Sequence, residues 1–254
     1  MKTPPRPVIL RFDSLPSTNT EAARQAASGA PEGLCVVARE QTRGRGRRER
    51  VWVSPMDAGL YLSIVLRPAA LAPDAWPLIT LMAALAVHEA LAQTCALDAD
   101  IKWPNDIVAG GRKLCGILAE TIETGTGRAV ILGIGVNLDD RAFPPELKET
   151  AASVASLTGN APDAETLLQS LLGAVFRRYA ALQAAGGGRE IIDAWSRRSS
   201  YADGRPVRVA LATETFDGLT RGLEPDGALR VETDQGEIRI VRAGDVTSLR
   251  GSDK

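Results

Sequence analysis

The chain has 254 residues, a formal net charge of −1, one histidine and three cysteines. This length fits one large domain or a large and a small one, and the near-neutral charge argues against a general nucleic-acid binder. The first residues lack the apolar core of a signal peptide, and we expect no apolar run of membrane-spanning length. A reduced cytoplasmic protein is therefore predicted, with Cys35, Cys95 and Cys115 buried as small apolar residues.

Hydrophobic periodicity predicts the elements of the first hundred residues. Thr18 and Glu21 have the spacing of a capping box at the start of a helix. His88, the single histidine, lies on a core-packed helix without a second metal ligand at a suitable spacing, which favours a structural role. Strands are predicted at residues 8–12, 34–38 and 60–66, and helices at 17–27 and 76–94.

The middle of the chain predicts a hairpin that carries a lysine. Gly110-Gly111 is a two-residue turn signal between strands at 107–109 and 112–121, after a strand that ends at 101–103. Alternation places Lys113 on the face of Cys115 and Ile117, opposite Gly116. Such a lysine is either a solvated edge charge or a site residue.

The remaining elements divide the chain in two. A buried strand at 130–137 carries Gly133 and Gly135 on one face, which indicates a groove for a ligand, a bulge, or close packing against a helix. Helices are predicted at 163–185 and 191–198. From Gly204 onward, short strands separated by turn signals indicate a small β-barrel of about five strands, with a boundary near Asp203.

The segment from Gln41 to Pro55 is the most unusual in the chain. It holds five arginines against one acid, Glu49, which is a local charge of +4. Gly44 and Gly46 alternate with arginines, and guanidinium groups match carboxylate and phosphate oxygens. The pattern predicts an anion-binding loop that becomes ordered when the anion arrives, although a solvated basic loop or a nucleic-acid patch has the same composition.

Four motifs together resemble the biotin–protein ligases. They are Ser17-Thr-Asn19, Gly44-Arg-Gly-Arg-Arg-Glu-Arg50 with Trp52 after it, Lys102-Trp-Pro-Asn-Asp106 with Arg112-Lys-Leu-Cys-Gly-Ile117, and Gly133-Ile-Gly-Val-Asn137. They occur in the family's order and cover nearly the whole chain. The resemblance implies an α+β fold, with a mixed β-sheet and helices in a class II synthetase-like catalytic core (1–203) and a small C-terminal SH3-like β-barrel (204–254).

The resemblance also implies an activity. Biotin and ATP would give biotinyl-5′-AMP, and the biotinyl group would pass to a lysine of a biotin carboxyl carrier protein, from acetyl-CoA carboxylase or another biotin-dependent carboxylase. Mg²⁺ is implied, with Asn105 and Asp106 as candidate ligands only. A monomer or weak homodimer is expected, without nucleic-acid or membrane partners. The alternatives are a lipoate or octanoate–protein ligase and a non-catalytic nucleic-acid-binding module.

The resemblance assigns the site residues as follows. Arg47 and Lys113 would be catalytic. Biotin would contact Ser17, Thr18, Asn19, Gln41, Arg45, Gly46, Arg47, Lys113 and Gly116. The adenylate would contact Arg45, Arg47, Trp52, Asn105, Lys113 and Asn137.

The chain departs from the family pattern at two loop positions. Glu49 replaces a glycine, where it could stiffen the loop or pair with a neighbouring arginine, and Arg43 replaces a small residue. No helix-turn-helix fits ahead of residue 8, so a DNA-binding repressor function is not expected.

Overall fold

A seven-stranded mixed sheet forms the centre of the molecule, in the order β1-β2-β3-β7-β6-β5-β4. The computed structural model describes residues 7–249. Strands β1 and β2 pair in parallel, and the other pairs are antiparallel. The strands are β1 (Val8–Leu15), β2 (Leu34–Gln41), β3 (Gly59–Leu66), β4 (Asp100–Lys102), β5 (Asp106–Ala109), β6 (Arg112–Thr124) and β7 (Gly127–Asn137).

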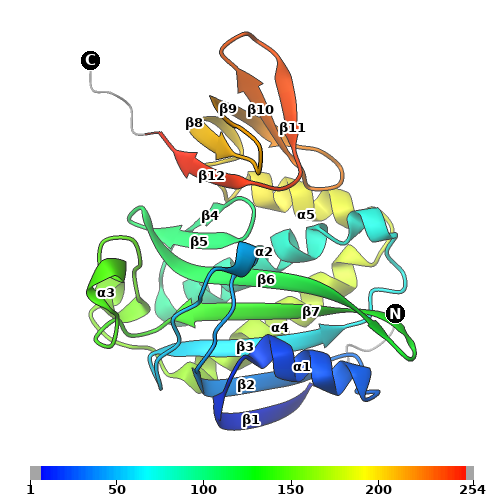
Figure 1. The fold of residues 1–254 in the computed structure, drawn as a ribbon, viewed down its shortest axis with the longest axis vertical. Helices are drawn as coiled ribbons and strands as arrows, with labels where there is room; N and C mark the ends of the chain where they lie inside the picture. Colours follow the sequence, from blue (N-terminus) through cyan, green and yellow to red (C-terminus); the bar gives the residue numbers. More distant parts are fainter. Residues whose placement is uncertain (1–6, 250–254) are drawn as a thin grey trace.

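Helices cover both faces of this sheet (Figure 1). On one face, α2 (Leu78–Cys95) and α4 (Ala164–Leu182) pack on each other and on the strands, and α5 (Gly187–Ser196) packs on α2. On the other face, α1 (Thr18–Ala27) contacts β2, β3 and β7 beside the arginine loop. The shorter helices are α3 (Val154–Thr158), η1 (Arg47–Glu49), η2 (Pro73–Ala75) and η3 (Pro145–Leu147).

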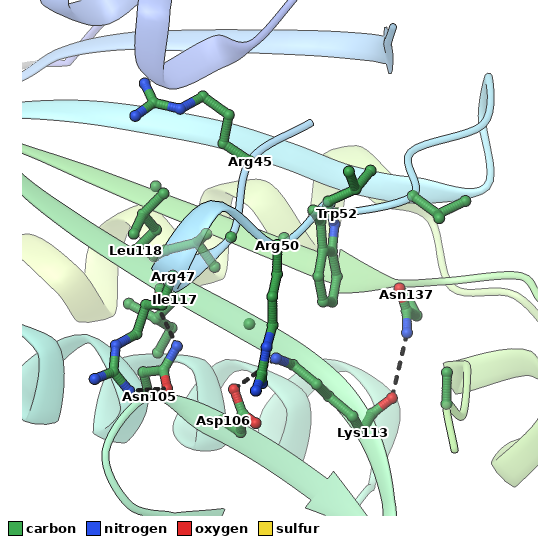
Figure 2. A pocket seen from close by; sticks show the side chains of 18 of the residues that line it. Arg45, Arg47, Arg50, Trp52, Asn105, Asp106, Lys113, Ile117, Leu118 and Asn137 are labelled. Atoms are coloured by element: carbon green, nitrogen blue, oxygen red, sulfur yellow. Dashed lines mark hydrogen bonds and ion pairs between the residues drawn. The ribbon is translucent and has the colours of Figure 1, made fainter. Parts of the chain in front are cut away.

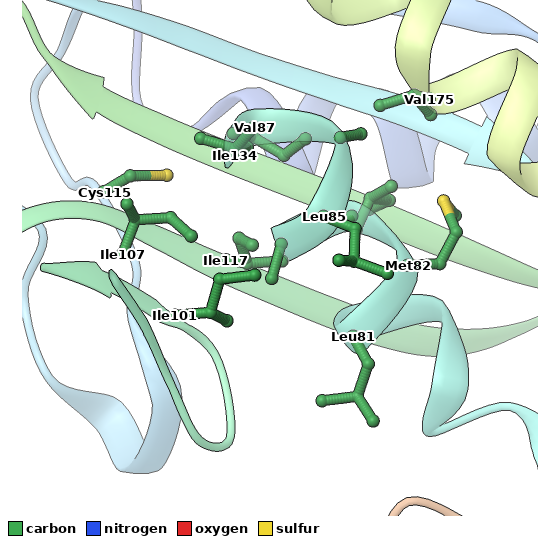
Figure 3. Close-up of a cluster of buried hydrophobic side chains, with 14 of the residues drawn as sticks. Leu81, Met82, Leu85, Val87, Ile101, Ile107, Cys115, Ile117, Ile134 and Val175 are labelled. Carbon is green, nitrogen blue, oxygen red and sulfur yellow. The ribbon is translucent and has the colours of Figure 1, made fainter. Parts of the chain in front are cut away.

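Alternating strand residues supply two hydrophobic clusters, because successive side chains point to opposite faces. Cys35 and Ile64 belong to the large cluster under α2 and α4, whereas Val36 and Val65 belong to the smaller cluster under α1. Figure 3 shows the large cluster, in which side chains of α2 meet side chains of β4, β5, β6 and β7. The sheet is therefore buried on both faces at its centre.

Helix α2 corrects one expectation from the sequence. The segment Pro73–Cys95 is long and apolar enough to cross a membrane by length and composition, so the expectation that no apolar run reaches that length is wrong. In the fold, 61% of its apolar window is buried, and α2 packs against α4, α5 and the sheet. This agrees with the core-packed helix predicted for the same region.

The C-terminal residues form a separate five-stranded antiparallel sheet, in the order β11-β10-β9-β8-β12. Its number of strands confirms the prediction. Trp103 Nε1 donates to the Gly227 carbonyl at 3.0 Å, which joins this sheet to the larger domain. The strands are β8 (Asp203–Ala210), β9 (Thr215–Leu223), β10 (Leu229–Thr233), β11 (Ile238–Val241) and β12 (Asp245–Ser248).

Three local predictions need correction. Ser17, not Thr18, is the N-cap of α1, and its side chain makes no capping hydrogen bond. Glu21 accepts from Arg24 and Gln25, so the predicted capping box does not form. Helix α5 begins at Gly187 rather than at the predicted residue 191, so Gly187 and Gly188 lie inside it. Cys95 is only half-buried, whereas the other two cysteines are buried.

Candidate active site

A cavity of about 360 Å³ opens between the arginine loop, α1, strands β6 and β7, and the start of β12. Small-molecule sites have volumes of this order. Every residue assigned to the site from the sequence lines this one cavity. They are Ser17, Thr18, Asn19, Gln41, Arg45, Gly46, Arg47, Trp52, Asn105, Lys113, Gly116 and Asn137.

A β-bulge places Lys113 in the cavity. Ile107 pairs with Cys115, but Val108 pairs with Lys113, so Leu114 is an extra residue on β6. Leu114 and Cys115 both enter the core, and Lys113 comes to the same side as Gly116. The predicted alternation, with Lys113 on the face of Cys115, is therefore wrong, because the bulge reverses it.

Polar groups at one end of the cavity form a nearly buried network. Gln41 Oε1 accepts from the backbone N–H of Thr18 at 2.8 Å, and Gln41 Nε2 donates to Ser54 Oγ at 2.8 Å. The hydroxyl of Ser63 lies 2.8 Å from that of Thr18 and 2.5 Å from Asn19 Oδ1. Ser63 was not predicted, although a serine within a buried strand was the signal that could have identified it.

The two glycines of β7 are covered by side chains from elsewhere in the chain. A Cβ at Gly133 would overlap the amide of Asn19, and one at Gly135 would lie 2.5 Å from Trp52 Nε1. A Cβ at Gly116 would also lie 3.0 Å from the Trp52 ring. Both glycines also line the cavity, so the groove expected there is present, and close packing against Asn19 and Trp52 occupies part of it. The indole of Trp52 lies on bare backbone of β6 and β7.

The arginine loop folds back on itself as an irregular hairpin. Backbone bridges join Gln41 to Ser54 and Arg45 to Val51, and the Gly46 N–H donates to the Arg50 carbonyl at 2.7 Å. At Gly44, a Cβ would collide with the carbonyl of Trp52, so the strands of the hairpin approach closely only because glycine stands there.

Polar groups from three other segments accept hydrogen bonds from the loop arginines. Arg45 pairs with Glu120 of β6 at 2.5 Å, and Arg47 donates to Asn105 Oδ1 at 3.2 Å. Figure 2 shows Arg47 beside Asn105, while Arg45 points away from them. Arg48 and Arg50 both reach Asp245 of β12.

The contacts of the arginine loop differ from the expected pattern in two ways. Glu49 makes no ion pair within residues 7–249, so the pairing considered for it from the sequence is absent from the described part of the chain. Glu120 and Asp245 were not predicted as partners of the loop, because both come from distant strands.

Three further charged side chains line the cavity. Lys113 Nζ lies 2.7 Å from Asp106 Oδ1 and 5.3 Å from the centroid of a Trp52 ring. Burial lowers the pKa of the Lys102 ammonium and of the Arg47 guanidinium, because desolvation disfavours their charged forms. An anionic ligand would compensate this cost. Lys102 was part of the quoted motif, but no role was assigned to it.

Metal ligands are sparse in the described part of the chain. Residues 7–249 contain no group of three or more His, Cys, Asp or Glu side chains that could hold a metal ion. His88 lies outside the cavity, 3.6 Å from Asp98, and burial lowers the pKa of its imidazole.

A polar recess beside a cluster of cations suits an enzyme that brings a carboxylate and a nucleotide phosphate together. The biotin/lipoate A/B protein ligase family matches residues 11–137, and the biotin protein ligase C-terminal domain matches residues 204–247. The chain belongs to the biotin/lipoate A/B protein ligase family.

The relatives agree with this family. The chain is 39% identical to the biotin–[acetyl-CoA-carboxylase] ligase of Paracoccus denitrificans, over 91% of this chain and 96% of the relative. It is 37% identical to the bifunctional ligase/repressor BirA of Bacillus subtilis, over 92% of this chain and 72% of the relative. The biotin protein ligase from Aquifex aeolicus in complex with biotin and ATP superposes with a TM-score of 0.82 at 27% identity, covering 95% and 98% of the two chains.

Proposed function

We propose that this protein is a biotin–protein ligase. It activates biotin with ATP as biotinyl-5′-AMP, releases pyrophosphate, and transfers the biotinyl group to a lysine of a biotin carboxyl carrier protein domain. The observation that carries the proposal is the convergence of four distant motifs on the lining of one cavity. Family membership and the likeness to a ligase that holds biotin and ATP support it.

The polar recess is proposed to hold the biotin head group. Ser17, Thr18, Asn19 and Gln41 supply donors and acceptors at the N-terminal end of α1. The first three are buried and Gln41 is half-buried, so a neutral ring system would be desolvated there. Hydrogen bonds between Thr18 and Gln41, and from Ser63 to Asn19, fix these side chains before a ligand binds, which lowers the entropy cost of binding. Gly116 gives the ligand room beside Lys113.

The cationic end is proposed to carry the chemistry. A biotin carboxylate that attacks the α-phosphate sets two anions against each other, at a cost of about 4 kcal/mol at ~4 Å and an effective dielectric near 20. Arg47 and Lys113 offset this repulsion and stabilise the charge that develops on the phosphorus oxygens. Arg45 and Gly46 belong to the loop that excludes water from the mixed anhydride.

The adenosine end is proposed to lie against Trp52 and Asn137. Asn137 Nδ2 donates to the Ala152 carbonyl at 2.9 Å, which holds its amide in the wall of the cavity. Asn105 and Asp106 offer the oxygens that Mg²⁺ prefers, and Mg²⁺ is commonly held by one or two protein oxygens together with the substrate's phosphates. The ion would neutralise the leaving pyrophosphate.

The pairing of the loop arginines favours a nucleotide ligand over nucleic acid. Glu120 and Asp245 already neutralise part of the charge that a DNA or RNA backbone would need. We therefore propose no nucleic-acid partner. We also propose a cytoplasmic location, which agrees with three free cysteines. A monomer or weak homodimer remains the expected state.

Acceptor modification tests the proposed function. The full chain is incubated with biotin, ATP, Mg²⁺ and a purified biotin carboxyl carrier domain, and the acceptor mass is measured. We expect the addition of one biotinyl group, and none on an acceptor whose target lysine is replaced by arginine. Equal or faster modification with lipoate or octanoate would favour the alternative ligase and overturn the assignment to biotin.

A further inference from the structure

Asp245 connects the small C-terminal sheet to the arginine loop. It is the first residue of β12, and its side chain is 29% exposed. Its Oδ2 atom accepts from Arg50, and Arg48 Nη1 lies 3.4 Å from the same oxygen. The carboxylate also lines the cavity described above. A residue of one sheet thus contacts a loop that belongs to the other.

Of the two arginines bound by Asp245, Arg48 lies within a strained turn and Arg50 directly follows it. Arg48 and Glu49 have φ values of 53° and 61°, which is the left-handed region. Residues other than glycine meet steric resistance there because of their Cβ, and such conformations persist only where the surrounding structure holds them. Two consecutive non-glycine residues in this region form a turn that would relax if the contacts that hold it were removed.

One carboxylate therefore holds Arg48 within the strained segment and Arg50 directly after it. Two backbone bonds close the turn, from the Arg50 N–H to the Arg47 carbonyl at 3.2 Å and from the Gly46 N–H to the Arg50 carbonyl at 2.7 Å, but both are local to the loop. Within residues 7–249, Arg48 and Arg50 form ion pairs with Asp245 and with no other residue. They fix the turn relative to the cavity that Arg47 lines.

We propose that Asp245 is a positioning residue, which holds the Arg47–Arg50 turn over the cavity so that the loop arginines are placed for the substrate's phosphates. The C-terminal sheet thereby contributes to ATP binding without contacting the reacting atoms. The kinetic part of this proposal rests on the proposed ligase function. The structural part, which concerns only the loop, does not.

Asp217 provides a matched control within the same sheet. Its carboxylate pairs with Arg208 of the neighbouring strand at 2.7 Å, so Asp217→Asn also removes an aspartate–arginine pair from the C-terminal domain. Asp217 does not line the cavity. A general loss of stability in this domain would therefore affect both variants, whereas loss of loop positioning would affect Asp245→Asn alone.

Limited trypsin digestion of the ligand-free full chain tests the structural part. Cleavage after the arginines at positions 43–50 is followed by mass spectrometry, with a thermal melt for each variant. A partly exposed ion pair contributes at most about 1 kcal/mol, which corresponds to about a fivefold change in the fraction of molecules whose loop is open to trypsin. Cutting in Asp245→Asn should therefore rise by up to about fivefold. Asp245→Glu should restore much of the protection, and Asp217→Asn should match the wild type. Equal cutting in Asp245→Asn and wild type would overturn the proposal.

The kinetic part is tested by the dependence of adenylate formation on ATP concentration. We expect Asp245→Asn to raise KM for ATP severalfold while kcat changes less, because the turn must be ordered again when ATP binds.

In a Glu49→Gly background, the effect of Asp245→Asn on cutting should shrink to about twofold or less, since glycine accepts the left-handed conformation. Faster cutting with an unchanged KM would refute the role in ATP binding. Absence of ligase activity in the wild type would refute the proposed function but leave the cutting test intact.

Discussion

Replacement of Lys113 by alanine should abolish adenylate formation while leaving the fold intact. Lys113 projects into the cavity because of the β-bulge at Leu114, and its ammonium pairs with Asp106 at 2.7 Å. A cation that meets charge developing in the transition state contributes on the order of 3 kcal/mol, so the loss in rate should be about a hundredfold or more. Arginine at this position should recover only part of the rate, because a planar fork cannot place a compact charge on one oxygen.

The effect of the same substitution on stability should be small. The Lys113 side chain is 36% exposed and that of Asp106 is 20% exposed, so their pair is partly screened by solvent. Such a pair contributes at most about 1 kcal/mol. For a chain of this size, that corresponds to a decrease in Tm of about 2–4 °C. Activity and stability should therefore change by very different amounts.

Single-turnover synthesis of the adenylate, measured beside a thermal melt, checks both expectations. Lys148→Ala is the matched control, because Lys148 is exposed and does not line the cavity. Near wild-type turnover in Lys113→Ala would refute the catalytic role. Loss of activity that merely follows early melting would show Lys113 to be a structural edge residue.

Three further outcomes are expected. Biotin and ATP together should slow tryptic cutting at 43–50, and equal rates with and without them would contradict closure of the loop over the ligand. Stability should fall as the pH drops below 6.5, the ordinary pKa of histidine, because burial lowers the folded-state pKa of His88 and the unfolded chain binds the proton more readily. His88→Gln should flatten the slope of the free energy of unfolding with pH in this range. Gly135→Ala should cost about 1–3 kcal/mol and displace Trp52, as judged by denaturant melts and indole fluorescence, whereas Gly125→Ala, which has open space, should be neutral.

The elements and most of the cavity could be predicted because their signals are local. Gly110-Gly111 and its flanking strands specified the hairpin that carries Lys113, and the register Ala109–Arg112 agrees with a two-residue turn. The apolar face of the helix expected at 163–185 predicted α4 to within a few residues. The four motifs of the sequence analysis predicted the lining of the cavity, because residues of each motif meet there.

What the sequence could not specify depends on contacts between distant residues. The extra residue at Leu114 leaves no mark in the apolar pattern, so simple alternation put Lys113 on the wrong face. Glu120 and Asp245 lie 75 and 195 positions from the arginines that they hold, and ordinary acidic residues on strands give no sign of such partners. The left-handed turn at Glu49 likewise follows from the fold of the loop rather than from its composition.

The most direct test of the central claim is biotin-dependent exchange of pyrophosphate into ATP by the purified full chain. Exchange reports reversible formation of the acyl-adenylate and needs no acceptor protein. We expect exchange that requires both biotin and Mg²⁺, is far weaker with lipoate or octanoate, and is lost in Lys113→Ala. Absence of exchange with biotin in a folded protein, or exchange supported equally by lipoate, would contradict the assignment of this cavity to biotin activation.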